Sequence, residues 1–188
     1  MIKKLLLPTY FLLLTSLYAH PICNKAISEI INRSITRTEK AHIKAYSKVD
    51  YMIINEYLRF GLSFVKKEYP KKIREKATSR IPYIKFALKK LPNYEGVVFR
   101  NVALENEIIE NILESGIYQD KAFVSTSRTK NPRFAGNVRM TILSKTGKNI
   151  EQFTAADESE VLFLPKTKFK LTDYKIENGL HYLELEEF

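Results

Sequence analysis

The sequence predicts an α+β domain in which a helical lobe comes first and a strand-rich part follows. Between residues 24 and 92, apolar residues recur at the spacing of helix faces. From Tyr94 onward the period changes, and turn signals separate short apolar runs that are typical of strands. Since helices precede strands instead of alternating with them, the order argues against a doubly wound sheet. A length of 188 residues suits one such domain.

The first 19 residues have the pattern of a signal peptide. Two lysines give the start a positive charge, an apolar run covers residues 5–17, and Ala19 is small enough for a cleavage position. The run is short for a membrane span, and an uncleaved membrane anchor is the alternative. We therefore expect a secreted protein whose mature part, residues 20–188, is a single domain without stable membrane insertion.

Composition narrows the classes of function. The net charge of +10 falls to +8 once the two lysines of the signal segment are removed, and the excess is concentrated in residues 66–90. No nucleic-acid-binding signature accompanies this run, so a solvated helix face or attraction to an anionic ligand or surface is favoured over nucleic acid. A single cysteine, Cys23, excludes an intramolecular disulfide. The three scattered histidines lack the spacing of a zinc site.

Helical signals divide the first half of the chain. Asn24 is a good N-cap for a first helix, and a second is expected over residues 37–46. Residues 47–50 offer a break and a new cap, after which a third helix would end at Gly61. Prolines punctuate the basic region, and a last helix is expected over residues 83–91.

Strand and turn signals dominate the second half. The pair Asn178-Gly179 is a strong signal for a two-residue hairpin turn, and Gly116 is a good helix terminator. We expect strands over residues 96–102, 122–127, 138–143 and 161–164, a helix over residues 104–115, and a turn at residues 145–148.

Two glutamates, Glu158 and Glu160, stand at the entrance of the strand that begins at Val161. Residues i and i+2 of an extended segment point to the same face, so the two carboxylates would lie side by side. Such a pair usually sits in solvent and discourages edge-to-edge pairing. Alternatively, it faces a cationic group that offsets the repulsion between the like charges.

Arg100 and a Ser-Thr-Ser run add further polar groups to predicted strands. Arg100 follows Val97, Val98 and Phe99, and a guanidinium in such apolar surroundings needs an acidic partner or an anionic ligand. A structural ion pair is the ordinary explanation, although arginine also grips phosphate oxygens in two-point fashion. Arg100, residues 125–127 and Glu160 thus place a cation, hydroxyls and a carboxylate on three separate strands.

These motifs resemble a mono-ADP-ribosyltransferase of the Arg-Ser-Glu class. This family includes the enzymatic components of clostridial binary toxins, related bacterial effectors and vertebrate ecto-enzymes. The strand arginine in VVFR (97–100), the hydroxyls in AFVSTS (122–127) and the Glu-x-Glu in ESEVLFLPKTKF (158–169) occur in the order of the family.

Two further stretches extend the resemblance, which spans residues 42–171. YSKVDYMIINEYLR (46–59) is similar to the helical segment of the family, and ALKKLPNYEGVVFR (87–100) to the approach to the arginine strand. Asn101 departs from the pattern, because relatives often carry glycine after the arginine. The resemblance implies an α+β fold with an N-terminal helical lobe and a mixed or antiparallel β-sandwich core of the ADP-ribosyltransferase type.

The resemblance also implies NAD+ as the substrate, with no metal. Glu160 would stabilise the positive charge that develops on the ribose when nicotinamide leaves, and Ser125 would hydrogen-bond its carboxylate. Arg100 would bind the pyrophosphate. Residues Thr126 and Ser127 would line the same pocket, and Phe134 would stack on the nicotinamide ring.

The resemblance further implies that Glu158 determines which acceptor is modified. A glutamate two residues before Glu160 goes with modification of arginine, whereas glutamine there goes with asparagine or related targets. A guanidinium is protonated at neutral pH, so a nearby carboxylate must orient it and help to remove a proton. The implied partner is a protein arginine of unknown identity, which Phe153 would contact, and entry into another cell would need a separate delivery or translocation partner.

Two other functions are compatible with the same motifs. The protein could be chiefly an NAD glycohydrolase, in which water is the acceptor. It could also be a catalytically silent module that binds NAD or protein and retains the fold, although the intact Arg100, Ser125, Glu158 and Glu160 set argues against this. An exported arginine-specific transferase, as a toxin or effector, is the favoured function.

Overall fold

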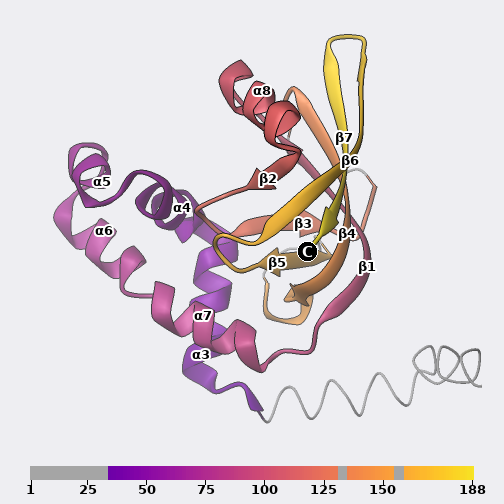
Figure 1. Cartoon of the computed structure of the whole chain (residues 1–188). Coiled ribbons are helices and arrows are strands. Elements are labelled where there is room, and N and C mark those ends of the chain that lie inside the picture. The colour runs from indigo at the N-terminus through magenta and orange to yellow at the C-terminus, as the bar shows by residue number, and fades with distance from the viewer. Residues whose placement is uncertain (1–33, 131–134, 155–158) are drawn as a thin grey trace, which may run out of the picture. The chain divides into compact units, whose positions relative to one another are not determined.

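Helices come first and strands follow in the computed structural model, which describes residues 34–130, 135–154 and 159–188 (Figure 1). Residues 37–188 form one compact unit. The expected signal peptide and the first helix from Asn24 lie outside the described residues. Within the described part, no helix is long and apolar enough to cross a membrane.

Short helices joined by tight bends make up the helical lobe. Their apolar stripes, including Ile43, Ile54, Ile84 and Leu88, are fully buried, as the spacing predicts. The segments are α3 (Arg37–Ala45), the π-helical η1 (Tyr46–Asp50), α4 (Tyr51–Phe60), α5 (Leu62–Glu68), α6 (Lys71–Thr78) and α7 (Ile81–Lys90).

The expected break at residues 47–50 is wrong, because η1 keeps the chain helical from α3 into α4. Asp50 makes no side-chain cap and has helical dihedral angles. Its carboxylate instead lies 2.7 Å from the Nε of Arg80, in an ion pair without good hydrogen-bond alignment. The expected end of α4 at Gly61 is confirmed, since Gly61 has a φ of 82°.

The strand-rich part begins at Tyr94 and contains one mixed sheet. Its elements are β1 (Tyr94–Val102), α8 (Asn106–Ser115), β2 (Ile117–Gln119), β3 (Val124–Ser127), β4 (Val138–Asn149), the 3-10 turn η2 (Glu151–Phe153), β5 (Glu160–Phe163), β6 (Lys168–Glu177) and β7 (Leu180–Glu187). The order is β1-β3-β5-β4-β7-β6-β2, and β4 also pairs with β1. Only the pairing of β4 with β7 is parallel among these strands. The predicted α+β class with a mixed sheet is confirmed.

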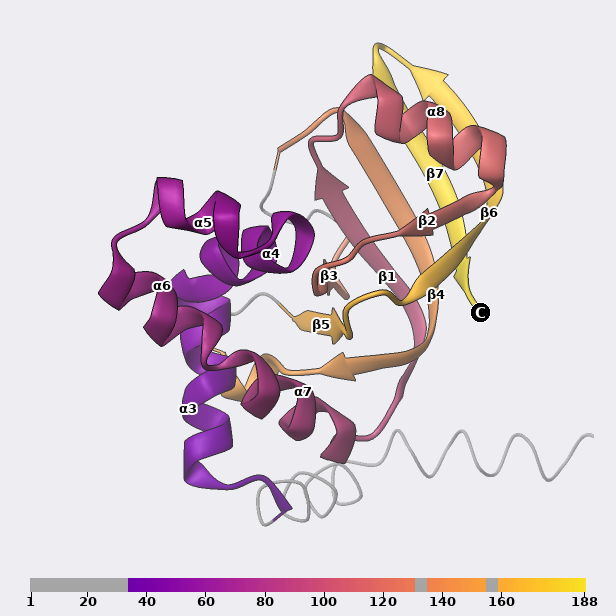
Figure 2. The same ribbon diagram turned by 60° about the vertical axis from the view of Figure 1, so that its left-hand side comes forward.

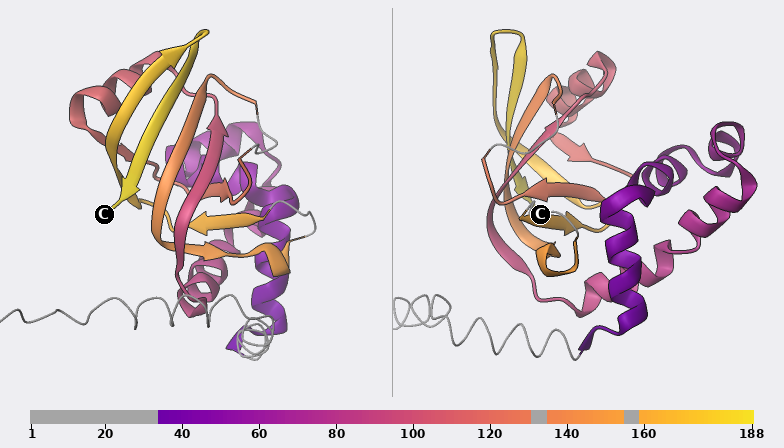
Figure 3. Two further views of the ribbon diagram at one scale, coloured as in Figure 1. Left: turned by 90° about the vertical axis from the view of Figure 1, so that its right-hand side faces the viewer. Right: turned by 180° about the vertical axis from the view of Figure 1, so that it is seen from behind.

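The sheet folds back on itself at the end that carries β3 and β5. These two short strands and the long strands β1 and β4 form a closed circuit of pairings, β1–β3, β3–β5, β5–β4 and β4–β1. Figure 2 shows β3 and β5 between the helical lobe and the long strands β1 and β4. The hairpin of β6 and β7 extends the sheet away from the lobe (Figure 3).

The expected turn at residues 145–148 is also wrong, because β4 continues through it to Asn149. The carboxylate of Glu187 accepts hydrogen bonds from the backbone N–H groups of Lys145, at 2.5 Å, and Thr146, at 2.7 Å. This distant carboxylate satisfies the backbone at the irregular point, so the strand goes on to pair with β5. The hairpin turn at Asn178-Gly179 is confirmed, with φ angles of 51° and 75°.

One apolar core holds the sheet and α8 together. Ile109 and Ile112 of α8 belong to one buried cluster with strand residues such as Val98 of β1 and Phe169 of β6. Phe163 at the end of β5 packs edge-on against Phe169, with ring centroids 5.1 Å apart. The core therefore supports β5 from behind, and β5 is the strand that begins with Glu160.

Candidate active site

Glu160 is a buried carboxylate held by two hydroxyl groups. It begins β5 and is only 4% exposed. Ser125 of β3 donates from Oγ to Oε1 at 2.6 Å, and Ser47 of η1 donates from Oγ to Oε2 at 3.0 Å. Hydrogen bonds to an ionised carboxylate are stronger than neutral ones, so the two serines offset part of the cost of burial.

The register of β3 and β5 explains why Ser125 reaches Glu160. The two strands are antiparallel, and Ser127 lies directly opposite Glu160. Ser125 is two residues away on the same face of β3, which makes it the diagonal neighbour of Glu160. Thr126 points to the other face, where its Oγ1 donates to the carbonyl of Val161 at 2.7 Å.

Ser127 and Thr126, which were expected to line the same pocket as Ser125, are not among its lining residues in the described structure. Both side chains are buried. The hydroxyls of Ser127 and Thr129 are 2.8 Å apart and share a hydrogen bond. Of the Ser-Thr-Ser run, only Ser125 faces the pocket.

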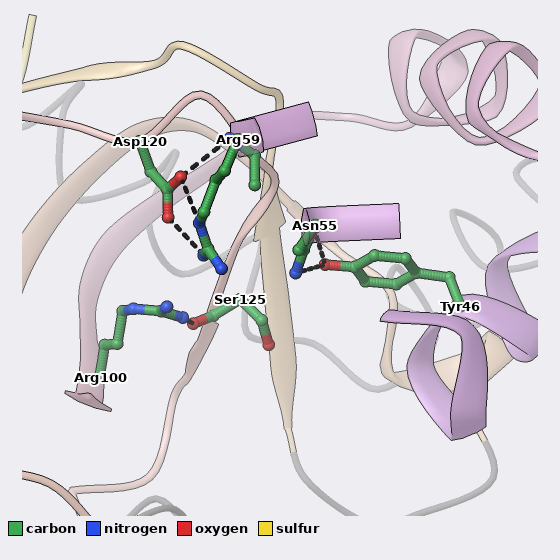
Figure 4. A network of polar contacts seen from close by, with 7 residues as sticks. Tyr46, Asn55, Arg59, Arg100, Asp120 and Ser125 are labelled. Atoms are coloured by element: carbon green, nitrogen blue, oxygen red, sulfur yellow. Dashed lines mark hydrogen bonds and ion pairs between the residues drawn. The ribbon is translucent and has the colours of Figure 1, made fainter. Parts of the chain in front are cut away.

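Arg100 lies on β1 beside Ser125 (Figure 4). Its Nη1 donates to the carbonyl oxygen of Ser125 at 2.6 Å. Its Nε is buried and has no hydrogen-bond partner among the described residues, and no carboxylate of these residues forms an ion pair with it. A buried N–H without a partner is costly, so this guanidinium is suited to an anionic ligand.

A second arginine, Arg59 of α4, is held by Asp120 (Figure 4). Its Nε and Nη2 donate to the two carboxylate oxygens at 2.9 and 2.6 Å, and the backbone N–H of Ala122 adds a third bond at 2.9 Å. Burial raises the pKa of Asp120, but the hydrogen bonds and charge of Arg59 outweigh burial and lower the pKa below its ordinary value. The pair therefore fixes Arg59 at the edge of the pocket.

We expect Asp120→Asn to lower the free energy of unfolding by about 2 kcal/mol at pH 7. Truncating a fully buried pair costs more, but the Arg59 side chain is 32% exposed. Because the folded-state pKa of Asp120 lies below its ordinary value of 3.8, its contribution is present above that pH and is lost as the pH falls through the folded-state pKa.

Urea unfolding of wild type and variant at pH 7 and near pH 3 measures this effect. The difference between the two proteins should shrink at the lower pH. Asp173→Asn, at an exposed position of β6, is the matched control and should change stability by less than about 0.5 kcal/mol. A difference for Asp120→Asn that is equally large at both pH values would contradict the expected role of the ion pair.

Tyr46 closes the pocket from the side of the helical lobe. Its ring is 1% exposed and packs edge-on against Phe123, with centroids 5.2 Å apart. Its hydroxyl lies 3.4 Å from Oδ1 and 3.2 Å from Nδ2 of Asn55 (Figure 4). Burial, and next the negative charge of Glu160, raise the pKa of Tyr46, so its phenol stays protonated at neutral pH.

These groups surround a pocket of about 370 Å³, within the range of small-molecule sites. A carboxylate and two guanidinium groups face the same space, which suits a ligand that carries both negative phosphates and a centre of developing positive charge. The lining residues are Tyr46, Ser47, Lys48, Tyr51, Asn55, Arg59, Arg100, Asn101, Val102, Ala103, Ser125, Ala135 and Glu160.

Sequence reasoning assigned no role to the helical side of this pocket, although it singled out the stretch 46–59. The missed residues, Ser47, Tyr51, Asn55 and Arg59, recur every fourth position. Residues at this spacing lie on one face of a helix. A stripe of polar side chains at helical spacing, beside the apolar face of Ile53 and Ile54, was the signal that could have identified them.

Two expected site residues, Glu158 and Phe134, lie outside the described residues. The residue that follows Glu158 is held at a defined place, because the backbone N–H of Arg128 donates to the carbonyl of Ser159 at 3.0 Å. Ser159 has a φ of 47°, and its Oγ donates to Glu151 at 3.1 Å. These contacts fix the point at which the chain enters β5.

The structure contradicts the expectation that Phe153 contacts a target protein. Its side chain is only 5% exposed and belongs to the 3-10 turn η2. Apolar burial accounts for its position, because a large aromatic ring at a loop gains more by packing inward than by remaining in water. It offers no surface to a partner in this arrangement.

Comparisons with known proteins agree with this architecture. The family model described as ADP-ribosyltransferase exoenzyme matches residues 23–188. The NAD(+)--protein-arginine ADP-ribosyltransferase Tre1 of Pseudomonas putida (strain GB-1) is 39% identical over 93 residues, which are 49% of this chain and 19% of Tre1. The putative NAD(+)--arginine ADP-ribosyltransferase Mav of Mycobacterium avium (strain 104) is 31% identical over 134 residues, 69% of this chain and 15% of Mav. The matched part is thus less than a fifth of either relative.

Among solved structures, the fold is similar to that of the ADP-ribosyltransferase Vis of Vibrio splendidus. The TM-score is 0.67 at 24% identity, and the match covers 87% of this chain and 83% of Vis. Since the family model covers nearly the whole chain and the fold agrees, this protein belongs to the ADP-ribosyltransferase exoenzyme family.

Proposed function

We propose that this protein is an exported, NAD+-dependent protein-arginine mono-ADP-ribosyltransferase that acts as a toxin or effector. The proposal rests above all on the buried carboxylate of Glu160, which Ser125 holds at 2.6 Å beside a pocket that Arg59 and Arg100 also line. Cleavage of a nicotinamide–ribose bond needs a fixed negative charge next to the sugar and cationic groups for the phosphates.

Glu160 acts at the bond-breaking step. Nicotinamide leaves with the electron pair of the glycosidic bond, and positive charge develops at C1′ and the ring oxygen of the ribose. The carboxylate of Glu160 stabilises this charge and accepts a hydrogen bond from a ribose hydroxyl. Because the buried carboxylate is oriented before the substrate binds, little reorganisation is needed in the transition state.

Arg100 and Arg59 bind the pyrophosphate of NAD+. The Nε of Arg100 is buried without a partner among the described residues, so a phosphate oxygen would satisfy it. A guanidinium has five N–H donors, and the ion pair with Asp120 uses two of those of Arg59. Both arginines line the pocket that contains Glu160. Phe134 would stack on the nicotinamide ring.

Arginine is the acceptor that Glu158 favours. A guanidinium nitrogen attacks C1′ of the ribose, a new C–N bond replaces the one to nicotinamide, and the carboxylate of Glu158 takes up the proton that the guanidinium loses. The names of Tre1 and Mav specify arginine, and Vis has been crystallised with agmatine, a small guanidinium compound. These relatives support an arginine acceptor.

Export follows from the signal-peptide pattern of residues 1–19, and residues 20–188 would then act as one catalytic domain. Structural relatives include the ADP-ribosyltransferase HopU1 of Pseudomonas syringae and the type III effector XopAI of Xanthomonas axonopodis. Action inside another cell would require a separate delivery or translocation partner.

The test is NAD+ consumption by the purified protein, with and without agmatine, while nicotinamide release and ADP-ribosyl-agmatine are followed together. Formation of the adduct supports the arginine transferase. Nicotinamide without the adduct would favour an NAD glycohydrolase or a different acceptor. If the folded protein forms neither product, the enzymatic function would be overturned and a silent binding module would be favoured.

A further inference from the structure

A second hydroxyl group holds the carboxylate of Glu160, and it comes from the helical lobe. Ser47 Oγ lies 3.0 Å from Glu160 Oε2, although the two residues are 113 positions apart in the chain. We propose that Ser47 is a positioning residue, which acts through Glu160 and fixes the orientation of its carboxylate for cleavage of the nicotinamide–ribose bond. The proposal rests on the function proposed above and deepens it.

One hydrogen bond does not fix a carboxylate group. The terminal torsion of a glutamate side chain has a broad energy profile, so a carboxylate held at one oxygen can still rotate. Here Ser125 of β3 holds Oε1 at 2.6 Å and Ser47 of η1 holds Oε2 at 3.0 Å. With each oxygen bound to a different element, the plane of the carboxylate is defined.

The backbone that carries Ser47 is itself well anchored. The π-helical geometry is visible in the bond from the N–H of Tyr51 to the carbonyl of Tyr46, five residues apart. Such turns are rare and occur frequently at functional sites. Tyr46 is buried on one side of Ser47, and on the other Asp50 lies 2.7 Å from Arg80 Nε. The backbone of Ser47 is therefore held in place, and its hydroxyl donates a hydrogen bond from a fixed position.

The contact leaves room for the substrate. A carboxylate offers about four lone-pair positions on its two oxygens, and the serines use one on each. A hydrogen bond from Ser47 to Oε2 therefore does not by itself exclude one from a ribose hydroxyl. Ser47 is half-buried and lines the pocket beside Glu160, so its hydroxyl is placed to orient the carboxylate without blocking it.

Loss of a positioning residue should lower turnover and leave the binding of NAD+ nearly unchanged. The arginines proposed to bind the pyrophosphate, Arg59 and Arg100, are held by Asp120 and by the carbonyl of Ser125, so removal of the Ser47 hydroxyl leaves these contacts in place. We expect Ser47→Ala to lower kcat for nicotinamide release by roughly tenfold, the loss typical of one charge-assisted hydrogen bond, while KM for NAD+ changes less than about twofold.

The experiment measures kcat and KM of the mature protein, residues 20–188, for wild type and four variants. Ser47→Thr restores a hydroxyl and should regain most of the rate. Ser63→Ala, which removes an exposed serine from α5, is the matched control and should equal wild type. Ser47→Cys keeps the size of the side chain but donates weakly, so it should show most of the loss even if Ser47→Ala folds poorly. Unchanged kcat in both Ser47→Ala and Ser47→Cys would overturn the proposal, as would a loss that Ser47→Thr does not restore.

A second readout does not depend on turnover. Crystal structures of wild type and Ser47→Ala should differ at Glu160, whose carboxylate is expected to lose its single orientation in the variant. An unchanged, well-ordered carboxylate would overturn the positioning role even if the wild-type protein does not cleave NAD+. Absence of nicotinamide release from the wild type would instead count against the proposed function.

Discussion

Glu160→Gln is expected to reduce nicotinamide release by about a thousandfold or more. Glutamine has the same shape and can keep hydrogen bonds with the two serines, but it carries no negative charge. The reaction develops positive charge on the ribose, so loss of the charge alone should raise the barrier. The effect should be large because Glu160 is only 4% exposed, and water screens its charge weakly there.

Single-turnover release of nicotinamide, with and without agmatine, measures this loss. Both the hydrolytic and the transferase products should disappear together, and Glu160→Ala should abolish them as well. Glu107→Gln, at an exposed position of α8, removes one carboxylate elsewhere and should retain wild-type activity. Glu160→Gln with more than a tenth of the wild-type rate would refute the electrostatic role of Glu160.

Glu158→Gln is expected to separate the two halves of the reaction. Transfer to agmatine should fall by roughly 10²- to 10⁴-fold, the usual contribution of a general base, while hydrolytic release of nicotinamide continues at a similar rate. The reason is that water can attack the ribose without this carboxylate, whereas a protonated guanidinium cannot lose its proton unaided. Glu158→Ala should behave in the same way.

The ratio of ADP-ribosyl-agmatine to free ADP-ribose, measured across a range of agmatine concentrations, reports this separation. Wild type should favour the adduct as agmatine increases, and the variant should yield ADP-ribose at every concentration. Equal loss of both products in Glu158→Gln would show that the residue acts in bond cleavage, and the division of labour between the two glutamates would be wrong.

The pocket lies where one helical face meets the closed end of the sheet. The stripe of Ser47, Tyr51, Asn55 and Arg59 supplies one wall, and β1, β3 and β5 supply the other. Two polar contacts tie the helical face to the strand-rich part, from Ser47 to Glu160 and from Arg59 to Asp120. Because both contacts involve buried carboxylates, changes in the packing of the helical lobe should reach the reacting end of the pocket directly.

Local patterns were sufficient for several parts of this protein. The helix-to-strand order, the end of α4 at Gly61 and the hairpin turn at Asn178-Gly179 each depend on residues within a few positions of one another. Arg100 and Glu160 could be singled out in the same way, because a charged residue in or at the start of an apolar strand is costly unless it has a partner. For these features, sequence and short-range physical chemistry agree with the structure.

Only the tertiary structure decided which distant groups meet. Ser47 and Glu160 are 113 residues apart, Arg59 and Asp120 are 61 apart, and Lys145 and Glu187 are 42 apart. The expected break at residues 47–50 and the expected turn at residues 145–148 were wrong because contacts of this kind override local signals. Strand register and helix packing determine these pairings, and both depend on how the whole core is filled, which no short stretch of sequence specifies.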